Sequence, residues 1–100
     1  MKKYTFHSDS GHGWLAVKAK ELKEFDLIKK ISSYSYISKS GKMVYLEEDC
    51  DMSLFREKLK RKGVLYMFVE KYKDGQSHIR KLEEFSELQL IVNEKYHRNS

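Results

Sequence analysis

Carboxylates and one thiol are the residues of this sequence best suited to chemistry. Four acidic side chains follow an apolar run and surround the only cysteine, Cys50: Glu47, Glu48, Asp49 and Asp51. Oxygen ligands of this kind bind Mg²⁺ and Ca²⁺, and acidic clusters can support phosphoryl transfer. The structural alternative is that Asp49 or Asp51 caps a helix beginning near Met52, while both glutamates are solvated or paired with lysines. We favour the structural interpretation and predict no metal ligand and no cofactor.

Cys50 itself is a weak candidate for a nucleophile. Neighbouring carboxylates raise the pKa of a thiol, whereas reactive cysteines need cations or a helix amino terminus beside them. The sequence has no second cysteine and no evident set of Ser, His and Asp around it. We therefore assign no catalytic residue. We predict that Cys50 is a small buried side chain, because cysteine is among the most buried residue types.

Histidines around a glycine-containing loop form a second group with chemical potential. His7, Asp9 and His12 could bind Zn²⁺ or carry protons, since imidazole titrates near neutral pH. Alternatively, Asp9 and Ser10 are turn residues whose side chains bond the loop backbone. The turn is the favoured interpretation. It places Asp9, His12 and the following Trp14 on a candidate binding loop.

Tyrosines interleaved with lysines form a third pattern. Tyr34, Tyr36 and Tyr45 lie among basic residues, and single-stranded nucleic acids bind where bases stack on rings and lysines follow phosphates. Tyrosine is also common in strands for packing reasons alone, so a core or edge role stays open. Lys60 and Arg61 belong to a basic run of the kind that is usually a solvated helix face.

Composition limits the kind of protein that carries these groups. The chain has 100 residues, no proline and 13% aromatic residues, which predicts a single domain over residues 1–100 with frayed last residues. One cysteine excludes an internal disulfide, and no segment has the pattern of a secretion signal or a membrane span. Lysine and arginine exceed aspartate and glutamate by five, which favours anionic partners or solubility. We expect a cytoplasmic protein with no membrane partner.

Local periodicity predicts the elements that position these residues. Alternation and turn residues indicate three hairpins: residues 3–8 with 14–17, 34–38 with 43–46, and 64–69 with 77–82. Residues 64–69 are apolar on both faces and are therefore predicted to be the central strand. Apolar spacing predicts three helices: residues 18–28 with a stop or interruption at Asp26, residues 51–62 with Gly63 as the stop, and residues 85–96. The expected fold class is α+β, a mostly antiparallel sheet built from hairpins with two or three helices packed on one face.

Three blocks of the sequence are distinctive in combination: residues 8–15 (SDSGHGWL), residues 34–36 (YSY) and residues 44–51 (VYLEEDCD). Together they resemble a group of small uncharacterised proteins from bacteriophages and plasmids, over roughly the first two thirds of the chain. The resemblance implies a mobile-element context and no particular reaction. Lys18 and Phe25-Asp26 depart from the pattern, which has a small or proline-like residue and Leu-Gly at these places. Both departures affect only the boundary of a helix.

Three functions fit these residues. The favoured one is a binding protein of a phage or mobile element that acts on a host protein or a protein–nucleic-acid complex, as an anti-CRISPR inhibitor does. Its binding residues would come from the loop, the tyrosines, the acidic stretch and the basic helix end: Asp9, His12, Trp14, Tyr34, Tyr36, Glu47, Glu48, Lys60 and Arg61. The second is a metal-assisted nucleic-acid or phosphoester enzyme with the four acids as ligands and His7 or His12 as proton carrier. The third is a general single-stranded nucleic-acid binder.

Overall fold

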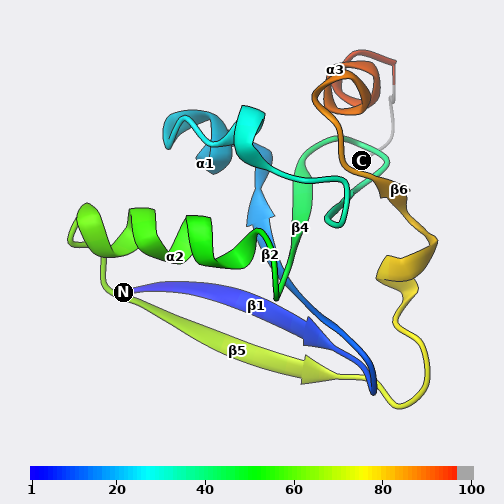
Figure 1. Ribbon diagram of the computed structural model, residues 1–100, viewed down its shortest axis with the longest axis horizontal. Helices are drawn as coiled ribbons and strands as arrows, with labels where there is room; N and C mark the ends of the chain where they lie inside the picture. The colour runs from blue at the N-terminus through cyan, green and yellow to red at the C-terminus, as the bar shows by residue number, and fades with distance from the viewer. Residues whose placement is uncertain (97–100) are drawn as a thin grey trace.

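Residues 1–96 are described by a computed structural model, and they form one sheet with helices packed on it (Figure 1). The sheet has six strands in the order β5-β1-β2-β4-β3-β6. In chain order the strands are β1 (Lys2–Ser8), β2 (Gly13–Lys18), β3 (Tyr36–Ile37), β4 (Met43–Glu47), β5 (Tyr66–Tyr72) and β6 (Glu83–Glu84). The helices are α1 (Ala19–Glu24), α2 (Met52–Arg61) and α3 (Glu87–Tyr96), with short 3-10 helices η1 (Ile28–Lys30) and η2 (His78–Lys81). The predicted α+β class is confirmed, whereas the predicted fraying after Tyr96 lies outside the described residues.

β1 and β2 form the predicted first hairpin. Phe6 lies opposite Leu15, and β4 pairs antiparallel with the other side of β2, where Leu46 is opposite Leu15. The chain passes close to itself at Gly13, because a Cβ atom there would lie 2.3 Å from the Phe6 ring. Glycine is the residue that fits under that ring.

One hydrophobic core lies between the sheet and helices α1 and α2. Alternate residues of β2 and β4 point into it and are almost completely buried: Leu15, Val17, Val44 and Leu46. Leu22 of α1 and Phe55 and Leu59 of α2 pack against them and are 0% exposed. Burying one such side chain stabilises a fold by about 1.5–3 kcal/mol. The side chains on this face of the sheet therefore contribute mainly to stability.

Both core helices end at a residue with left-handed backbone. Asp26 has φ +57° and follows α1, while Gly63 has φ +66° and follows α2. Amides beyond these residues close the helices through the bonds Leu27 to Leu22 and Val64 to Leu59, at 2.9 and 3.0 Å. Such bonds satisfy carbonyl groups that a helix end leaves unpaired. The predicted stops at Asp26 and Gly63 are confirmed, and α1 is shorter than predicted because its last residue is Glu24.

The prediction that residues 64–69 form the central strand is wrong. β5 lies at an edge of the sheet and runs parallel to β1, with Phe68 beside Tyr4. Phe68 packs against the core, but Met67 and Val69 on the other face are 42% and 44% exposed. A strand that is apolar on both faces is buried only where other elements cover both faces. In the described part of the chain, α1 and α2 both lie on the Phe68 side.

The predicted third hairpin is also wrong, because residues 77–82 do not return beside β5. They contain η2, after which β6 pairs with β3 at the far edge of the sheet, with Glu84 opposite Tyr36. The Ser77 amide and the Arg80 guanidinium both donate hydrogen bonds to Asp9, and these bonds hold the segment at the end of the first hairpin. β3 is shorter than predicted, which leaves Tyr34 outside it in a turn.

α3 is the predicted final helix and attaches through one side. Leu90 is 2% exposed, and the side-chain amide of Asn93 donates to the Ser38 carbonyl at 3.0 Å. The other large apolar side chains of the helix are exposed: Leu88, Ile91, Val92 and Tyr96. α3 therefore covers the end of the β3–β4 hairpin and presents apolar side chains outward.

Candidate functional site

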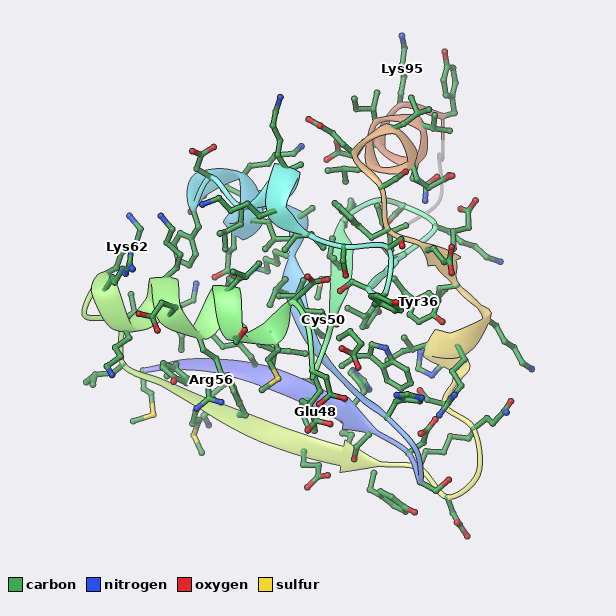
Figure 2. The ribbon with its side chains drawn as sticks, in the orientation of Figure 1. Tyr36, Glu48, Cys50, Arg56, Lys62 and Lys95 are labelled. Carbon is green, nitrogen blue, oxygen red and sulfur yellow. The ribbon has the colours of Figure 1, made fainter. Side chains whose placement is uncertain are left out.

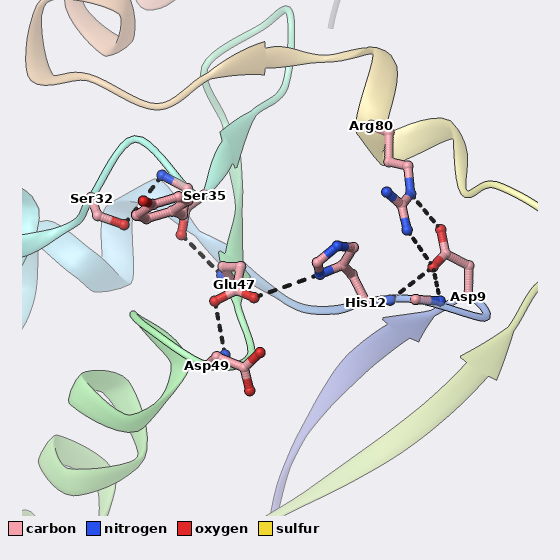
Figure 3. A network of polar contacts seen from close by, with 9 residues as sticks. Asp9, His12, Ser32, Ser35, Glu47, Asp49 and Arg80 are labelled. Carbon is pink, nitrogen blue, oxygen red and sulfur yellow. Dashed lines mark hydrogen bonds and ion pairs between the residues drawn. The ribbon is translucent and has the colours of Figure 1, made fainter.

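Asp9 is the centre of a buried ionic contact at one end of the sheet, which we call the Asp9–Arg80 lock (Figure 3). Arg80 donates to this carboxylate from Nε at 2.7 Å and from Nη2 at 2.8 Å. The amides of Gly11, His12 and Ser77 donate to it at 3.0, 3.0 and 2.9 Å. The side chain of Asp9 is 0% exposed and that of Arg80 is 28% exposed. The lock orders the loop after β1 and ties it to the start of η2.

These contacts fix the charges of both partners. The Arg80 guanidinium holds the pKa of the Asp9 carboxyl far below its ordinary value; the three amides act in the same direction, although burial opposes them. The hydrogen bonds to Asp9 in turn raise the pKa of Arg80. A carboxylate held in this way stays ionised near neutral pH and does not serve as a general acid or base. The predicted role of Asp9 as a turn residue is confirmed.

Aromatic rings pack beside the lock on the face of the sheet opposite the core. Trp14 is 2% exposed and lies under Arg80, whose guanidinium carbon is 5.5 Å from the centroid of the indole ring. The rings of His12 and Tyr36 lie 6.0 and 6.1 Å from the same indole. The buried Nε1 of Trp14 has no acceptor among the described residues. Trp14 therefore supports the loop from below, and its ring is not presented on the surface.

His7 lies on this same face and has a different set of neighbours. Its ring is 5.8 Å from the Tyr45 ring and 6.1 Å from the His78 ring. Burial lowers the pKa of His7, and the charges of His78 and Lys71 lower it further. His7 therefore favours the neutral form near pH 7. It packs within this aromatic group, whereas His12 packs on Trp14.

Glu47 ends β4 as a carboxylate that is only 8% exposed. Its Oε2 atom accepts the Asp49 amide at 2.8 Å, and its Oε1 atom lies 4.0 Å from Nδ1 of His12. The Glu47 amide donates to the Ser35 hydroxyl at 2.9 Å (Figure 3). Glu47 thus holds the turn before α2 and approaches the loop from the other side.

The sequence predicts that Asp49 or Asp51 caps α2, but the side chain of Asp51 does not. It occupies the N-cap position, but its carboxylate makes no bond to the helix amides. Its Oδ2 atom instead accepts the Ser32 amide and hydroxyl at 3.0 and 2.7 Å and the Ser35 hydroxyl at 2.5 Å. Three converging donors satisfy a buried carboxylate better than one cap bond would. These hydrogen bonds link the loop before β3 to the start of α2.

The prediction that Cys50 is buried is wrong, because the residue lies exposed in the turn between β4 and α2. Figure 2 shows it near Glu48 at the beginning of the helix. Desolvation of the thiol raises its pKa, and the hydrogen bond to Glu47 and the charges of Glu47, Asp51 and Asp49 raise it further. The predicted effect of the carboxylates on the thiol pKa is confirmed. Connecting turns run over the surface of a protein, so a side chain in one can be exposed whatever its polarity.

A cavity of about 290 Å³ opens between the loop after β1 and the end of β5. Its lining combines both elements with the turn before α2: Phe6, Ser8, Asp9, Ser10, Gly11, His12, Glu48, Glu70 and Tyr72. Glu48 is exposed, and Glu70 accepts the Ser8 hydroxyl at 2.6 Å. With Asp9 neutralised by Arg80, the two glutamates give the rim of this cavity a negative charge.

Five of the nine predicted binding residues come together around the lock: Asp9, His12, Trp14, Tyr36 and Glu47. Glu48 joins them through the cavity. Tyr34 is 68% exposed in a separate turn. Lys60 and Arg61 lie at the far end of α2, the end that Lys62 marks in Figure 2.

Two chemical arrangements considered from the sequence do not assemble. Tyr36 and Tyr45 are neighbours on one face of the sheet and pack on Trp14 and His7, but Tyr34 lies outside β3 in a turn, so the predicted set of three strand tyrosines is not formed. Within residues 1–96, no three His, Cys, Asp or Glu side chains are placed to share a metal ion. In the acidic stretch, Glu47 instead bonds the turn before α2, Asp51 bonds the loop before β3, and Glu48 lies exposed beside the cavity.

Sequence reasoning missed Arg80, Ser32 and Ser35, which donate five of the eight hydrogen bonds that Asp9 and Asp51 accept. The cluster of serines at residues 32–35 was the available signal, because hydroxyl groups beside a strand often satisfy a buried acid. Arg80 carries no such local signal. Its partner lies at the other end of the chain.

No protein-family model matches the chain, and no curated protein or solved structure matches it either. The resemblance to phage and plasmid proteins therefore stays an expectation that rests on three sequence blocks. Within the described residues, no helix is both long and apolar enough to cross a membrane.

Proposed function

We propose that this chain is a binding protein that acts on a macromolecular partner and catalyses no reaction. An anti-defence inhibitor of a phage or mobile element, such as an anti-CRISPR protein, is the concrete case. The observation that carries the proposal is the Asp9–Arg80 lock, which holds an exposed loop in one conformation and leaves its central carboxylate without a free site for chemistry.

Internal contacts occupy the buried acidic side chains. Asp9 and Asp51 each accept three or more hydrogen bonds from within the protein. Glu21 accepts the Tyr4 hydroxyl at 2.7 Å and pairs with Lys2 at 3.3 Å. Carboxylates that are satisfied by structural donors stabilise the fold and have little capacity for proton transfer. This supports a binding role over an enzymatic one.

The loop itself has the properties of a preformed recognition element. Ser10, Gly11 and His12 are exposed above the locked carboxylate, with Glu48 across the 290 Å³ cavity. A loop that is already ordered avoids the loss of about 0.5–1.5 kcal/mol per immobilised side chain on binding. The negative rim fits a partner surface that carries lysine or arginine.

Charge is separated along α2 in a way that would orient such an encounter. Acidic residues lie in the turn before the helix, and basic residues gather in its last turn: Lys58, Lys60 and Arg61, followed by Lys62. Opposed patches of charge raise association rates and favour one docking orientation. A host protein, or a protein bound to nucleic acid, offers both signs of charge to these two ends.

Affinity capture from a host lysate, followed by mass spectrometry, tests this proposal. The informative variant is Glu48→Lys, which reverses the charge on the cavity rim. Its control is Glu24→Lys, the same change at an exposed side chain of α1 that belongs to neither charged end of α2. We expect wild type and the control to retain a host protein that Glu48→Lys loses. No retained protein at low salt contradicts the binding function, and equal retention by all three proteins contradicts the assigned surface.

A further inference from the structure

The two edges of the sheet are protected to very different degrees. β6 is two residues long and both are glutamates, which discourages pairing with another strand. β5 is seven residues long, contains no proline, and carries the exposed side chains of Met67, Val69 and Tyr72. In residues 1–96, no strand pairs with its outer edge. A long apolar edge of this kind is a template for strand pairing.

The direction of the β5 backbone groups follows from its bonds to β1. The Leu65 carbonyl accepts the Lys2 amide, and the Lys73 amide donates to the Ser8 carbonyl, both at 2.9 Å. Backbone groups alternate sides along a strand, so odd-numbered residues face β1. The amides and carbonyls of the four even-numbered residues therefore point to the open edge: Tyr66, Phe68, Glu70 and Tyr72.

We propose that a second copy of this chain binds here, with the two β5 strands antiparallel about a two-fold axis at Val69. Val69 is the middle residue of Tyr66–Tyr72, so this register uses the whole strand. It pairs Phe68 with Glu70 and Tyr66 with Tyr72, which are the residues whose backbone groups face outward. About eight hydrogen bonds between the copies then satisfy the open edge.

Side chains on both faces fit this register. On the open face the two Val69 side chains meet, and Met67 lies opposite the stem of Lys71 of the other copy. On the helix face, Glu70 of one copy lies beside Phe68 of the other, and the Arg56 guanidinium is 5.9 Å from the centroid of that Phe68 ring. The pairing therefore brings two carboxylates to two guanidinium groups across the axis.

Space is available on the helix face for the Tyr72 ring of the second copy. A cavity of about 210 Å³ lies beside Tyr66 and is lined by Ser53, Arg56, Glu57 and Lys60 of α2. Tyr72, which is 61% exposed, would enter this cavity from the second copy. Figure 1 shows β5 as the outermost element on its side of the molecule, with α2 on the other side of β1 in that view. A second copy therefore has access to the strand.

Disulfide trapping tests the register. In a Cys50→Ser background, Val69→Cys places two thiols at a non-hydrogen-bonded pair, where Cα atoms are about 4.5 Å apart and a disulfide can form. Met67→Cys is the matched control, because the two Met67 residues are four positions out of register and about 13 Å apart. We expect mild oxidation to yield covalent dimers with Val69→Cys and not with Met67→Cys. Equal yields from the two variants, or no dimer from Val69→Cys, overturn the proposal.

Charge exchange tests the contact between Arg56 and Glu70. Sedimentation equilibrium should show wild-type dimers at micromolar to millimolar concentration. Glu70→Arg and Arg56→Glu should each weaken dimerisation by about tenfold, because each turns two attractions into two repulsions, and the double variant should restore it. A cooperative thermal transition at a concentration where wild type is monomeric shows that the variants fold, although Glu70→Arg also loses the bond from the Ser8 hydroxyl. A monomer at every concentration, or a double variant as weak as the single ones, overturns the proposal.

This inference does not depend on the proposed binding function. Host-protein capture is measured with Glu48→Lys and dimerisation with Val69→Cys, a residue that does not line the cavity of about 290 Å³, so either can fail alone.

Discussion

Replacing Asp9 by asparagine keeps the shape of the side chain at the centre of the Asp9–Arg80 lock and removes its charge. Oδ2 of Asp9 accepts Nε of Arg80 and the amide of Ser77. An amide nitrogen in that place is itself a donor, so both donors lose their acceptor. Ser77 is 4% exposed, and its amide is therefore left largely without water to replace the bond.

The expected loss follows from the burial of the two partners. Removing one member of a buried ion pair costs about 3–5 kcal/mol of unfolding free energy. The Arg80 side chain is 28% exposed, so water solvates it in part and the lower end applies. We expect about 3 kcal/mol at pH 7, a large share of the total stability of about 5–15 kcal/mol that is usual for a domain.

The effect must also depend on pH in one direction. The pKa of Asp9 is lowered in the folded state, so its contribution is fully present above the unfolded pKa of about 3.9 and declines as the unfolded chain takes up a proton. Wild type then loses about 1.4 kcal/mol per pH unit below pH 4 from this group, and Asp9→Asn does not. The difference between the two proteins should narrow to about 2 kcal/mol at pH 3.

Urea unfolding followed by circular dichroism at pH 7 and pH 3 measures both quantities. Asp74→Asn, in an exposed turn, controls for the general effect of removing one negative charge. A difference below about 1 kcal/mol at pH 7 refutes the structural importance of the lock. A difference that is the same at both pH values refutes the assignment of a lowered pKa.

Four other results follow from local geometry. Gly63→Ala should destabilise the protein by about 1 kcal/mol in urea unfolding, because alanine is strained at φ +66° even though the space around the new Cβ atom is open. Asp26→Gly should stabilise the protein by a similar amount, since glycine adopts φ +57° without strain. Gly13→Ala should cost at least about 1–3 kcal/mol, because the methyl group meets the Phe6 ring at 2.3 Å; a thermal scan that shows no loss contradicts this close approach. Cys50 should react with iodoacetamide more slowly at pH 8 than a small free thiol does, and Glu47→Gln should speed the reaction; an equal rate before and after the substitution contradicts the raised thiol pKa.

The sequence predicts well those features that neighbouring residues determine. The first hairpin depends on turn residues after β1, and the helix stops depend on Asp26 and Gly63, so each carries its signal within a few positions. The apolar run at residues 64–69 is different. Its residue types predict a strand clearly, but the place of that strand in the sheet depends on which side of β1 is still open, and no local pattern contains that information.

The candidate site shows the same division. Turn preference identifies Asp9 as a residue that bonds its own loop, and the amides of Gly11 and His12 do donate to it. The two strongest donors come from Arg80, which no spacing rule connects with residue 9. Asp51 likewise shows that a residue in the N-cap position need not bond the helix amides. Its carboxylate accepts hydrogen bonds from hydroxyl groups of another loop instead.

The parallel pairing of β1 with β5 has a consequence for synthesis on the ribosome. β1 finds β2 almost at once, but its other side stays without a partner until α2 and all of β5 have left the exit tunnel. Closing so long a loop is slow, and an unpaired strand is exposed to other growing chains in the meantime. Lys2 and Lys3 lie at the start of β1, where their charge opposes pairing between nascent chains during this interval.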